Sequence, residues 1–393
     1  MTVHEAWQLL DDQLAAGRFP GFAAGVRHRG EVAYHVGGTL ALDRPAPVTP
    51  DSLFRIASLT KPVGAALVLN LVEHGLLSLD DPVARWLPEL AAPRVLRQPD
   101  GDLTDTVPAE RPILVRDLLA FTAGFGLLMA DTPLQRAIVA AGLRPGPTVP
   151  ELGPDEFAQR LGALPLAHQP GARWMYHTGS DAAAVLVRRL TGRPVGELLA
   201  ERVTGPLGLT ATGYHTRELD RLTTHYLPTP AGLQVSDPPD GRHSRPPAFE
   251  SLGNGLVSSV ADYLAFLDVF TGRTPVLGPA TAALMVTDGL TAGQRAGVTE
   301  LMGPGLSWGL GLSVQVAPDP SAPDPSVADP VAGHPVLAPG RYGWNGGSGV
   351  TAYVDPSREL AAVLFTPRMM AAPRGEFDAF WAALYRGIDP TEA

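Results

Sequence analysis

The chain has no cysteine, and it has a single lysine, Lys61, among its 393 residues. The absence of cysteine excludes disulfides, thiol catalysis and cysteine-bound zinc or iron–sulfur clusters. The ten histidines form no His-Glu-x-x-His motif and no tight cluster along the sequence. We therefore expect no metal site.

Positive charge and long apolar runs are also scarce. The 30 basic residues against 40 acidic ones give a net charge of −10, which disfavours nucleic acid and anionic membrane surfaces as partners. The longest apolar run, 63–72, is interrupted by Asn70 and is too short to span a bilayer. Residues 1–7 show no signal-peptide pattern, so we expect a cytoplasmic protein. Its oligomeric state is not fixed by the sequence.

Strand-like patterns lie at both ends of the chain. Residues 23–26 and 32–35 flank Arg29-Gly30 and predict one β-hairpin, and 350–354 and 360–365 flank a turn at 355–358 and predict a second. Helical patterns occupy much of the rest, at 62–74, 115–121, 155–161, 180–190, 259–270 and 376–386.

We therefore predict a single α+β domain over 1–393. An antiparallel sheet formed by both chain ends, in 1–60 and 290–393, is flanked by helices, and 61–289 forms a mainly helical insertion. Two segments rich in proline and aspartate, 227–249 and 317–340, are predicted to be long surface loops.

The single lysine stands in a Ser-x-x-Lys pattern with Ser58. Arginine stays protonated, whereas a desolvated lysine can lose its proton and act as a base. Residues three apart on a helix are neighbours, so Lys61 can reach the Ser58 hydroxyl. The positive end of the helix predicted from residue 62 disfavours the ammonium form and favours an oxyanion at Ser58. The pattern therefore predicts a serine nucleophile with a lysine base.

Five segments in chain order resemble the serine β-lactamase-like hydrolases, the family of class C β-lactamases, D-alanyl-D-alanine peptidases and family VIII esterases. They are LFRIASLTKP at 53–62, ILVRDLLAFTAG at 113–124, WMYHTGSD at 174–181, GNGLVSSVADY at 253–263 and YGWNGG at 342–347. The resemblance covers nearly the whole chain. It implies the β-lactamase/transpeptidase-like fold, with no cofactor.

The resemblance also assigns roles. Ser58 would form an acyl-enzyme, and Lys61 and Tyr176 would share the general base and acid work. We expect the nearby ammonium to favour the Tyr176 phenolate, which would then serve as a base. The backbone amides of Ser58 and Gly347 would form the oxyanion hole, and Gly346 would allow a close approach to the substrate.

Two departures from the family pattern point to neutral esters. Thr178 stands where β-lactamases and peptidases have asparagine, and Trp344 stands where their last motif has lysine, which matches the form typical of family VIII esterases. The loss of a fixed cation removes selectivity for anionic ligands, and tryptophan offers an apolar stacking surface. Leu128 and Met129 are candidates for an apolar acyl site. His177 can line the pocket, although a solvent-facing histidine is the simpler expectation.

We therefore predict a serine esterase that acts on small-molecule esters with short or medium acyl chains. β-Lactamase, D-amino-acid peptidase or amidase, and acyltransferase activities remain open, because each uses the same acyl-enzyme. A catalytically silent binding protein is a further alternative. Ser307 stands in a Gly-x-Ser-x-Gly motif at 305–309, but a strand-like continuation argues against the nucleophile elbow of α/β-hydrolases.

Overall fold

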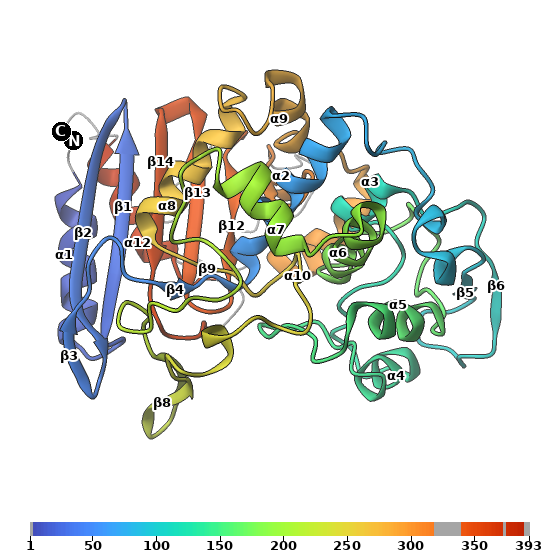
Figure 1. Ribbon diagram of the computed structural model, residues 1–393, viewed down its shortest axis with the longest axis horizontal. Helices are drawn as coiled ribbons and strands as arrows, with labels where there is room; N and C mark the ends of the chain where they lie inside the picture. The colour runs from blue at the N-terminus through green and yellow to red at the C-terminus, as the bar shows by residue number, and fades with distance from the viewer. Residues whose placement is uncertain (1–2, 318–338, 372–374, 389–393) are drawn as a thin grey trace.

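The computed structural model describes residues 3–317, 339–371 and 375–388 and shows an α+β fold with a sheet beside a largely helical part (Figure 1). An antiparallel eight-stranded sheet has the order β10-β11-β12-β13-β14-β1-β2-β3. Its strands are β1 (Gly21–His28), β2 (Glu31–Ala41), β3 (Arg44–Pro47), β10 (Leu306–Trp308), β11 (Ser313–Gln315), β12 (Tyr342–Gly346), β13 (Val350–Asp355) and β14 (Leu360–Phe365). The antiparallel pairing of β1 with β14 joins the two chain ends, as predicted.

Both predicted hairpins are present. In the first, β1 pairs with β2 in a register that places Ala24 opposite His35 and Val26 opposite Ala33. Its turn residues Arg29 and Gly30 have φ values of 51° and 82°, the left-handed conformation that a tight hairpin turn between right-twisted strands requires.

Alternate residues of β1 face two different layers. Phe22 and Ala24 pack with α1 (His4–Ala15) and α12 (Asp378–Ile388), whereas Ala23 belongs to the main core on the other face. There α8 (Val260–Phe266) crosses β1 so closely that a Cβ at Gly25 would lie 2.8 Å from Val260 Cγ1. The central strands β1, β13 and β14 are therefore buried on both faces, which explains why they are almost continuously apolar, whereas β2 and β3 at the edge are partly exposed.

The helical part surrounds α2 (Thr60–Glu73), whose residues from Thr60 to Leu71 are all buried. Gly75 follows it with φ of 71°, the left-handed conformation in which glycine commonly ends a helix. The other helices are α3 (Val115–Leu119), α4 (Pro133–Ala140), α5 (Pro154–Gly162), α6 (Thr178–Thr191), α7 (Val195–Leu199), α9 (Pro279–Met285) and α10 (Ala292–Met302). Two-stranded sheets pair β4 (Phe54–Arg55) with β9 (Val257–Ser258) and β5 (Arg94–Leu96) with β6 (Thr106–Pro108).

The structure contains four helices that were not predicted, α4, α7, α9 and α10, and it differs from the predicted elements at further places. The segment 227–249 is not simply a loop, because β7 (His225–Thr229) and β8 (Gly232–Asp237) form a hairpin there. Helix α1 went unpredicted, since only Ala6 and Leu10 of its residues are buried and its apolar pattern is weak. Most of the predicted 317–340 loop lies outside the described residues, and the boundaries that we predicted between the sheet and helical parts stay predictions.

Among the described residues, no helix combines the length and the apolar character that crossing a membrane would require.

Candidate active site

Ser58 lies where a strained backbone enters the buried helix. It belongs to the 3-10 turn η1 (Ala57–Leu59), which leads directly into α2. The preceding residue, Ala57, has φ of 41°, an unfavourable conformation for a residue with a Cβ. Such strain costs about 1–3 kcal/mol and persists only where the surrounding structure holds it. Ser58 is partly exposed, whereas its neighbours Ala57 and Leu59 are buried.

Lys61 reaches Ser58 as the sequence predicted. Its Nζ lies 3.0 Å from Ser58 Oγ, and only 1% of the residue is exposed. Burial lowers the pKa of Lys61 to about 7, although the negative charge of Asp181 partly opposes this shift. Lys61 can therefore hold a neutral amine against the serine hydroxyl near neutral pH.

Tyr176 completes this group of side chains. Lys61 Nζ lies 4.6 Å from the centre of the Tyr176 ring, and the Tyr176 hydroxyl accepts a hydrogen bond of 2.7 Å from Trp344 Nε1. Burial raises the pKa of Tyr176, outweighing its hydrogen bonds with Ser58 and Trp344. Our prediction of a phenolate base is therefore wrong. Desolvation disfavours the phenolate more than its neighbours favour it, so Tyr176 keeps its proton.

His177 points into the protein, which contradicts the solvent-facing position that we expected. Only 3% of it is exposed, and its Nδ1 lies 3.2 Å from Lys61 Nζ. Its φ of 87° and ψ of −65° form a tight turn in which Thr178 N donates to Tyr176 O. This turn allows two successive side chains, Tyr176 and His177, to reach the same amine.

Asp181 and Ser251 form a chain of polar contacts with His177, and neither residue was predicted from the sequence. Asp181 Oδ2 lies 3.4 Å from His177 Nε2, and Asp181 Oδ1 accepts a hydrogen bond of 2.5 Å from Ser251 Oγ. Ser251 Oγ in turn accepts from the amide of Gly253, whose carbonyl oxygen accepts a 2.7 Å hydrogen bond from Lys61 Nζ. The i, i+4 spacing of His177 and Asp181 was the available sequence signal.

Gly346 brings the end of β12 against the nucleophile segment. A Cβ at Gly346 would lie 2.4 Å from the carbonyl oxygen of Ile56, so only glycine permits this approach. Gly347 follows in the turn after β12 and is partly exposed, and its carbonyl accepts a hydrogen bond from Met370 N. The oxyanion hole from the Ser58 and Gly347 amides stays a prediction, and this packing explains how the two segments are held side by side.

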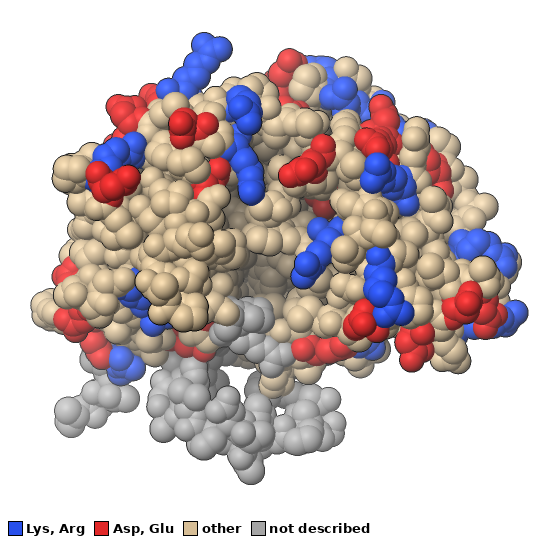
Figure 2. All heavy atoms as spheres, turned by 90° about the horizontal axis from the view of Figure 1, so that it is seen from below, with Lys and Arg blue, Asp and Glu red and all other residues tan. Residues whose placement is uncertain are grey.

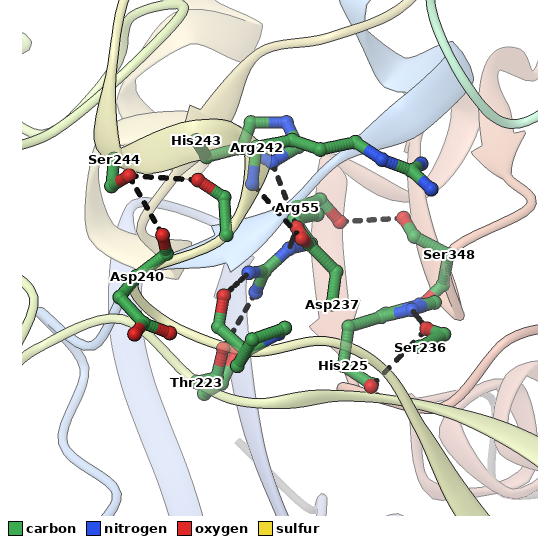
Figure 3. A network of polar contacts seen from close by, with 12 residues as sticks. Arg55, Thr223, His225, Ser236, Asp237, Asp240, Arg242, His243, Ser244 and Ser348 are labelled. Atoms are coloured by element: carbon green, nitrogen blue, oxygen red, sulfur yellow. Dashed lines mark hydrogen bonds and ion pairs between the residues drawn. The ribbon is translucent and has the colours of Figure 1, made fainter.

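A buried polar network also holds the segment before Ser58 and the turn after β12 together (Figure 3). Ser348 Oγ donates a hydrogen bond of 2.5 Å to the carbonyl of Arg55, three residues before the nucleophile. The Arg55 guanidinium donates to Asp237 Oδ2 at 2.6 Å, and His225 Nε2 lies 3.2 Å from the Ser348 carbonyl oxygen. Asp237 is the last residue of β8. The β7–β8 hairpin, where we expected a loop, therefore supports Arg55 and the segment before Ser58.

The predicted substrate contacts lie at different depths. Thr178 is 4% exposed and Trp344 is 3% exposed, whereas Leu128 is half-buried and Met129 is 68% exposed. The expected stacking surface of Trp344 is largely covered, because its ring packs edge-on against Trp308 at 4.6 Å. Figure 2 shows a hollow near the centre of the lower face, lined in this view by uncharged residues, with both basic and acidic side chains around it. Whether these predicted residues contact a substrate stays a prediction.

Ser307 does not form a nucleophile elbow. It lies inside β10, is fully buried, and hydrogen-bonds with Asp288 and with Arg295 Nε, the latter at 3.2 Å. The chain continues from β10 into β11 and not into a helix, so the motif lacks its required context. Over the described ranges, no group of three or more histidine or acidic residues could hold a metal ion.

Comparisons with known proteins show what the chain is similar to. The beta-lactamase family model matches residues 7–386. Protein Rv1367c of Mycobacterium tuberculosis is 36% identical over 334 residues, covering 81% of this chain and 78% of that protein. Esterase EstB of Burkholderia gladioli is 32% identical over 377 residues, covering 91% and 88%. The solved structure of EstCE1, described as a hydrolase with promiscuous acyltransferase activity, superposes with a TM-score of 0.80 at 24% identity and covers 98% of both chains.

Proposed function

Because the chain belongs to the beta-lactamase family, we propose that it is a serine esterase that hydrolyses small neutral esters through an acyl-enzyme on Ser58. The observation that carries this proposal is the 3.0 Å contact between the partly exposed Ser58 hydroxyl and the fully buried Lys61 amine, whose pKa is about 7. Esterase EstB, which aligns over 91% of this chain, supports the choice of ester substrates.

In the first step, Lys61 accepts the Ser58 proton while Ser58 Oγ forms a bond with the ester carbonyl carbon. The carbonyl oxygen becomes an oxyanion, which we expect the Ser58 and Gly347 amides to stabilise. The positive end of α2, directly after Ser58, favours the same negative charge.

In the second step, the bond to the leaving alcohol breaks and its oxygen needs a proton. Tyr176 is suited to give it, because Trp344 Nε1 donates to the phenol oxygen and leaves the hydroxyl hydrogen free to point toward the reaction. The proton held by Lys61 then restores the Tyr176 hydroxyl. Water attacks the acyl-enzyme by the reverse sequence, which releases the acid and regenerates Ser58.

The preference for neutral substrates rests on two positions. Trp344 supplies an indole where a cation would attract a substrate carboxylate, and that indole is used to position Tyr176. The Thr178 side chain is buried at the start of α6 and leaves no amide to hold a peptide-like side chain. β-Lactams and D-amino-acid peptides are therefore expected to be poorer substrates than uncharged esters.

The first test measures initial rates of p-nitrophenyl butyrate hydrolysis by the wild type and by Lys61→Arg. Arginine keeps the positive charge but cannot lose a proton, so the rate should fall by about 10²–10⁴-fold, the usual size of general-base catalysis. Incubation with substrate followed by intact-mass measurement should show an acyl group on the wild type and none on Ser58→Ala.

Other results of these measurements would contradict the proposal or favour one of the alternative functions. Equal rates in wild type and Lys61→Arg would contradict the proposal. A wild type that hydrolyses a chromogenic cephalosporin faster than the ester would favour the β-lactamase alternative. Ester formation with an added alcohol that outruns hydrolysis would favour acyl transfer. A protein that never acylates would fit a catalytically silent binding role.

A further inference from the structure

The Lys61 amine has three polar neighbours, and the proposed base role depends on how its hydrogens are shared among them. Nζ lies 2.7 Å from the Gly253 carbonyl oxygen, 3.0 Å from Ser58 Oγ and 3.2 Å from His177 Nδ1. A neutral amine has two N–H donors and one lone pair. It can accept the serine proton only when the lone pair faces Ser58, so both hydrogens must find acceptors elsewhere.

Gly253 can take one of these hydrogens, because a carbonyl oxygen only accepts. The second acceptor must be His177 Nδ1, and a neutral imidazole accepts at only one of its two nitrogens. If Nδ1 carried the hydrogen, it would compete with Ser58 for the lysine lone pair. The tautomer of His177 therefore decides whether Lys61 can act on Ser58.

Asp181 selects the productive tautomer. An ionised carboxylate only accepts, so its position 3.4 Å from His177 Nε2 favours the hydrogen on Nε2 and leaves Nδ1 as an acceptor. The Ser251 hydroxyl and the positive end of α6, whose first turn contains Asp181, both stabilise that carboxylate. Only 4% of Asp181 is exposed, which keeps water from replacing it as the partner of His177.

We propose that His177 and Asp181 are positioning residues that turn the Lys61 lone pair toward Ser58. In this arrangement Asp181 holds the Nε2–H tautomer, and His177 Nδ1 and the Gly253 carbonyl each accept one amine hydrogen. The strained φ of 87° at His177 fits such a role, since an unfavourable backbone conformation is retained where geometry matters for function. The proposal rests on Lys61 being the base of the proposed esterase, but not on the identity of the ester.

The test measures the rate at which a fluorophosphonate modifies Ser58, followed by intact mass, because this reports serine nucleophilicity without a known substrate. The key variants are His177→Asn and His177→Leu. The Asn Oδ1 can occupy the place of Nδ1 as an acceptor, and asparagine tolerates positive φ better than most residues. We expect His177→Asn to stay within about 10-fold of wild type and His177→Leu to be slower by about 10²-fold or more, within the range of general-base effects.

Asp181→Asn gives an independent variant, because its amide can donate to Nε2 and turn Nδ1 into a donor. We expect labelling to slow by about 10–100-fold, the loss typical when a carboxylate that orients a metal-binding histidine is removed. Asp117→Asn is the matched control. Asp117 is also a buried carboxylate, 2% exposed and paired with Arg111, but it has no contact with His177. It should lose stability without a comparable loss of labelling rate.

Two results would overturn the inference. One is a His177→Leu variant labelled as fast as wild type, and the other is His177→Asn slowed as much as His177→Leu in folded protein. If His177→Leu fails to fold, the comparison of Asp181→Asn with Asp117→Asn decides. Equal labelling rates for these two variants would also overturn the inference. A wild type that is labelled at Ser58 but cleaves no ester would overturn the proposed function alone.

Discussion

At the scale of single residues, burial distinguishes Lys61 from Tyr176. From the sequence, either residue could serve as the general base or the general acid. Desolvation disfavours charge, so it makes the Lys61 amine easier to deprotonate and the Tyr176 phenol harder to deprotonate. The same physical effect therefore suits lysine to the role of base and tyrosine to the role of acid in the proposed mechanism.

The pH dependence of activity follows from this separation. Lys61 must be neutral to accept the serine proton, so activity should be lost as the pH falls through its pKa of about 7. Because burial raises the pKa of Tyr176 above its ordinary value of 10, activity should stay on a plateau from about pH 8 to 10. Measurement of kcat/KM from pH 5 to 10 checks this expectation. A bell-shaped profile with an alkaline limb near pH 8 would contradict the acid role of Tyr176.

At the scale of secondary-structure elements, the site depends on how β12 and its turn pack against the segment before α2. Gly346 approaches Ile56, and Ser348 is bonded to the Arg55 carbonyl. These contacts hold together two backbone segments that are far apart in sequence and that would present their amides to one oxygen atom in the proposed oxyanion hole. The hairpin of β7 and β8 contributes through Asp237.

Ser348→Ala should loosen this junction. The buried Arg55 carbonyl loses its hydroxyl partner, at a cost to the free energy of unfolding of about 1–3 kcal/mol. If the junction positions the Gly347 amide, kcat for p-nitrophenyl butyrate should fall while KM changes little, because the lost interaction is made in the transition state. The matched control is Thr366→Val, which removes a similar hydroxyl contact of 2.9 Å to the Gly349 carbonyl without touching Arg55. Equal kcat values for the two variants would contradict this role of Ser348.

At the scale of the whole molecule, several buried or half-buried histidines link stability to pH. Burial and the Arg55 charge lower the pKa of His225 from its ordinary value of 6.5 to about 4. Burial also lowers the pKa of His177, His243 and His168. The unfolded chain binds these protons more readily than the folded protein does. Stability should therefore fall as the pH drops below about 6.5.

His225→Gln isolates one part of this effect. The shift from 6.5 to about 4 corresponds to a stability loss on the order of 3 kcal/mol between those pH values, and glutamine cannot titrate. Urea unfolding of both proteins at pH 7 and pH 4.5 should show a smaller pH-dependent loss for the variant. Parallel losses in the two proteins would place the proton uptake elsewhere.

Local sequence patterns were sufficient where neighbours in the chain are also neighbours in space. The Ser58–Lys61 contact follows from one helical turn, the two hairpins follow from their turns, and the buried α2 follows from its apolar composition. The weakly patterned α1 and the β7–β8 hairpin were missed, because their structure depends on packing against distant segments.

The sequence by itself thus determined the fold class, the serine–lysine pair and the position of Tyr176 within a recognisable motif. Only the tertiary structure decided that Tyr176 keeps its proton, that Trp344 supports it, and that His177 and Asp181 lie behind Lys61. The physical reason is that protonation depends on desolvation and on the hydrogen-bond partners that the fold brings together. These are properties of three-dimensional surroundings, which the spacing of residues along a chain does not specify.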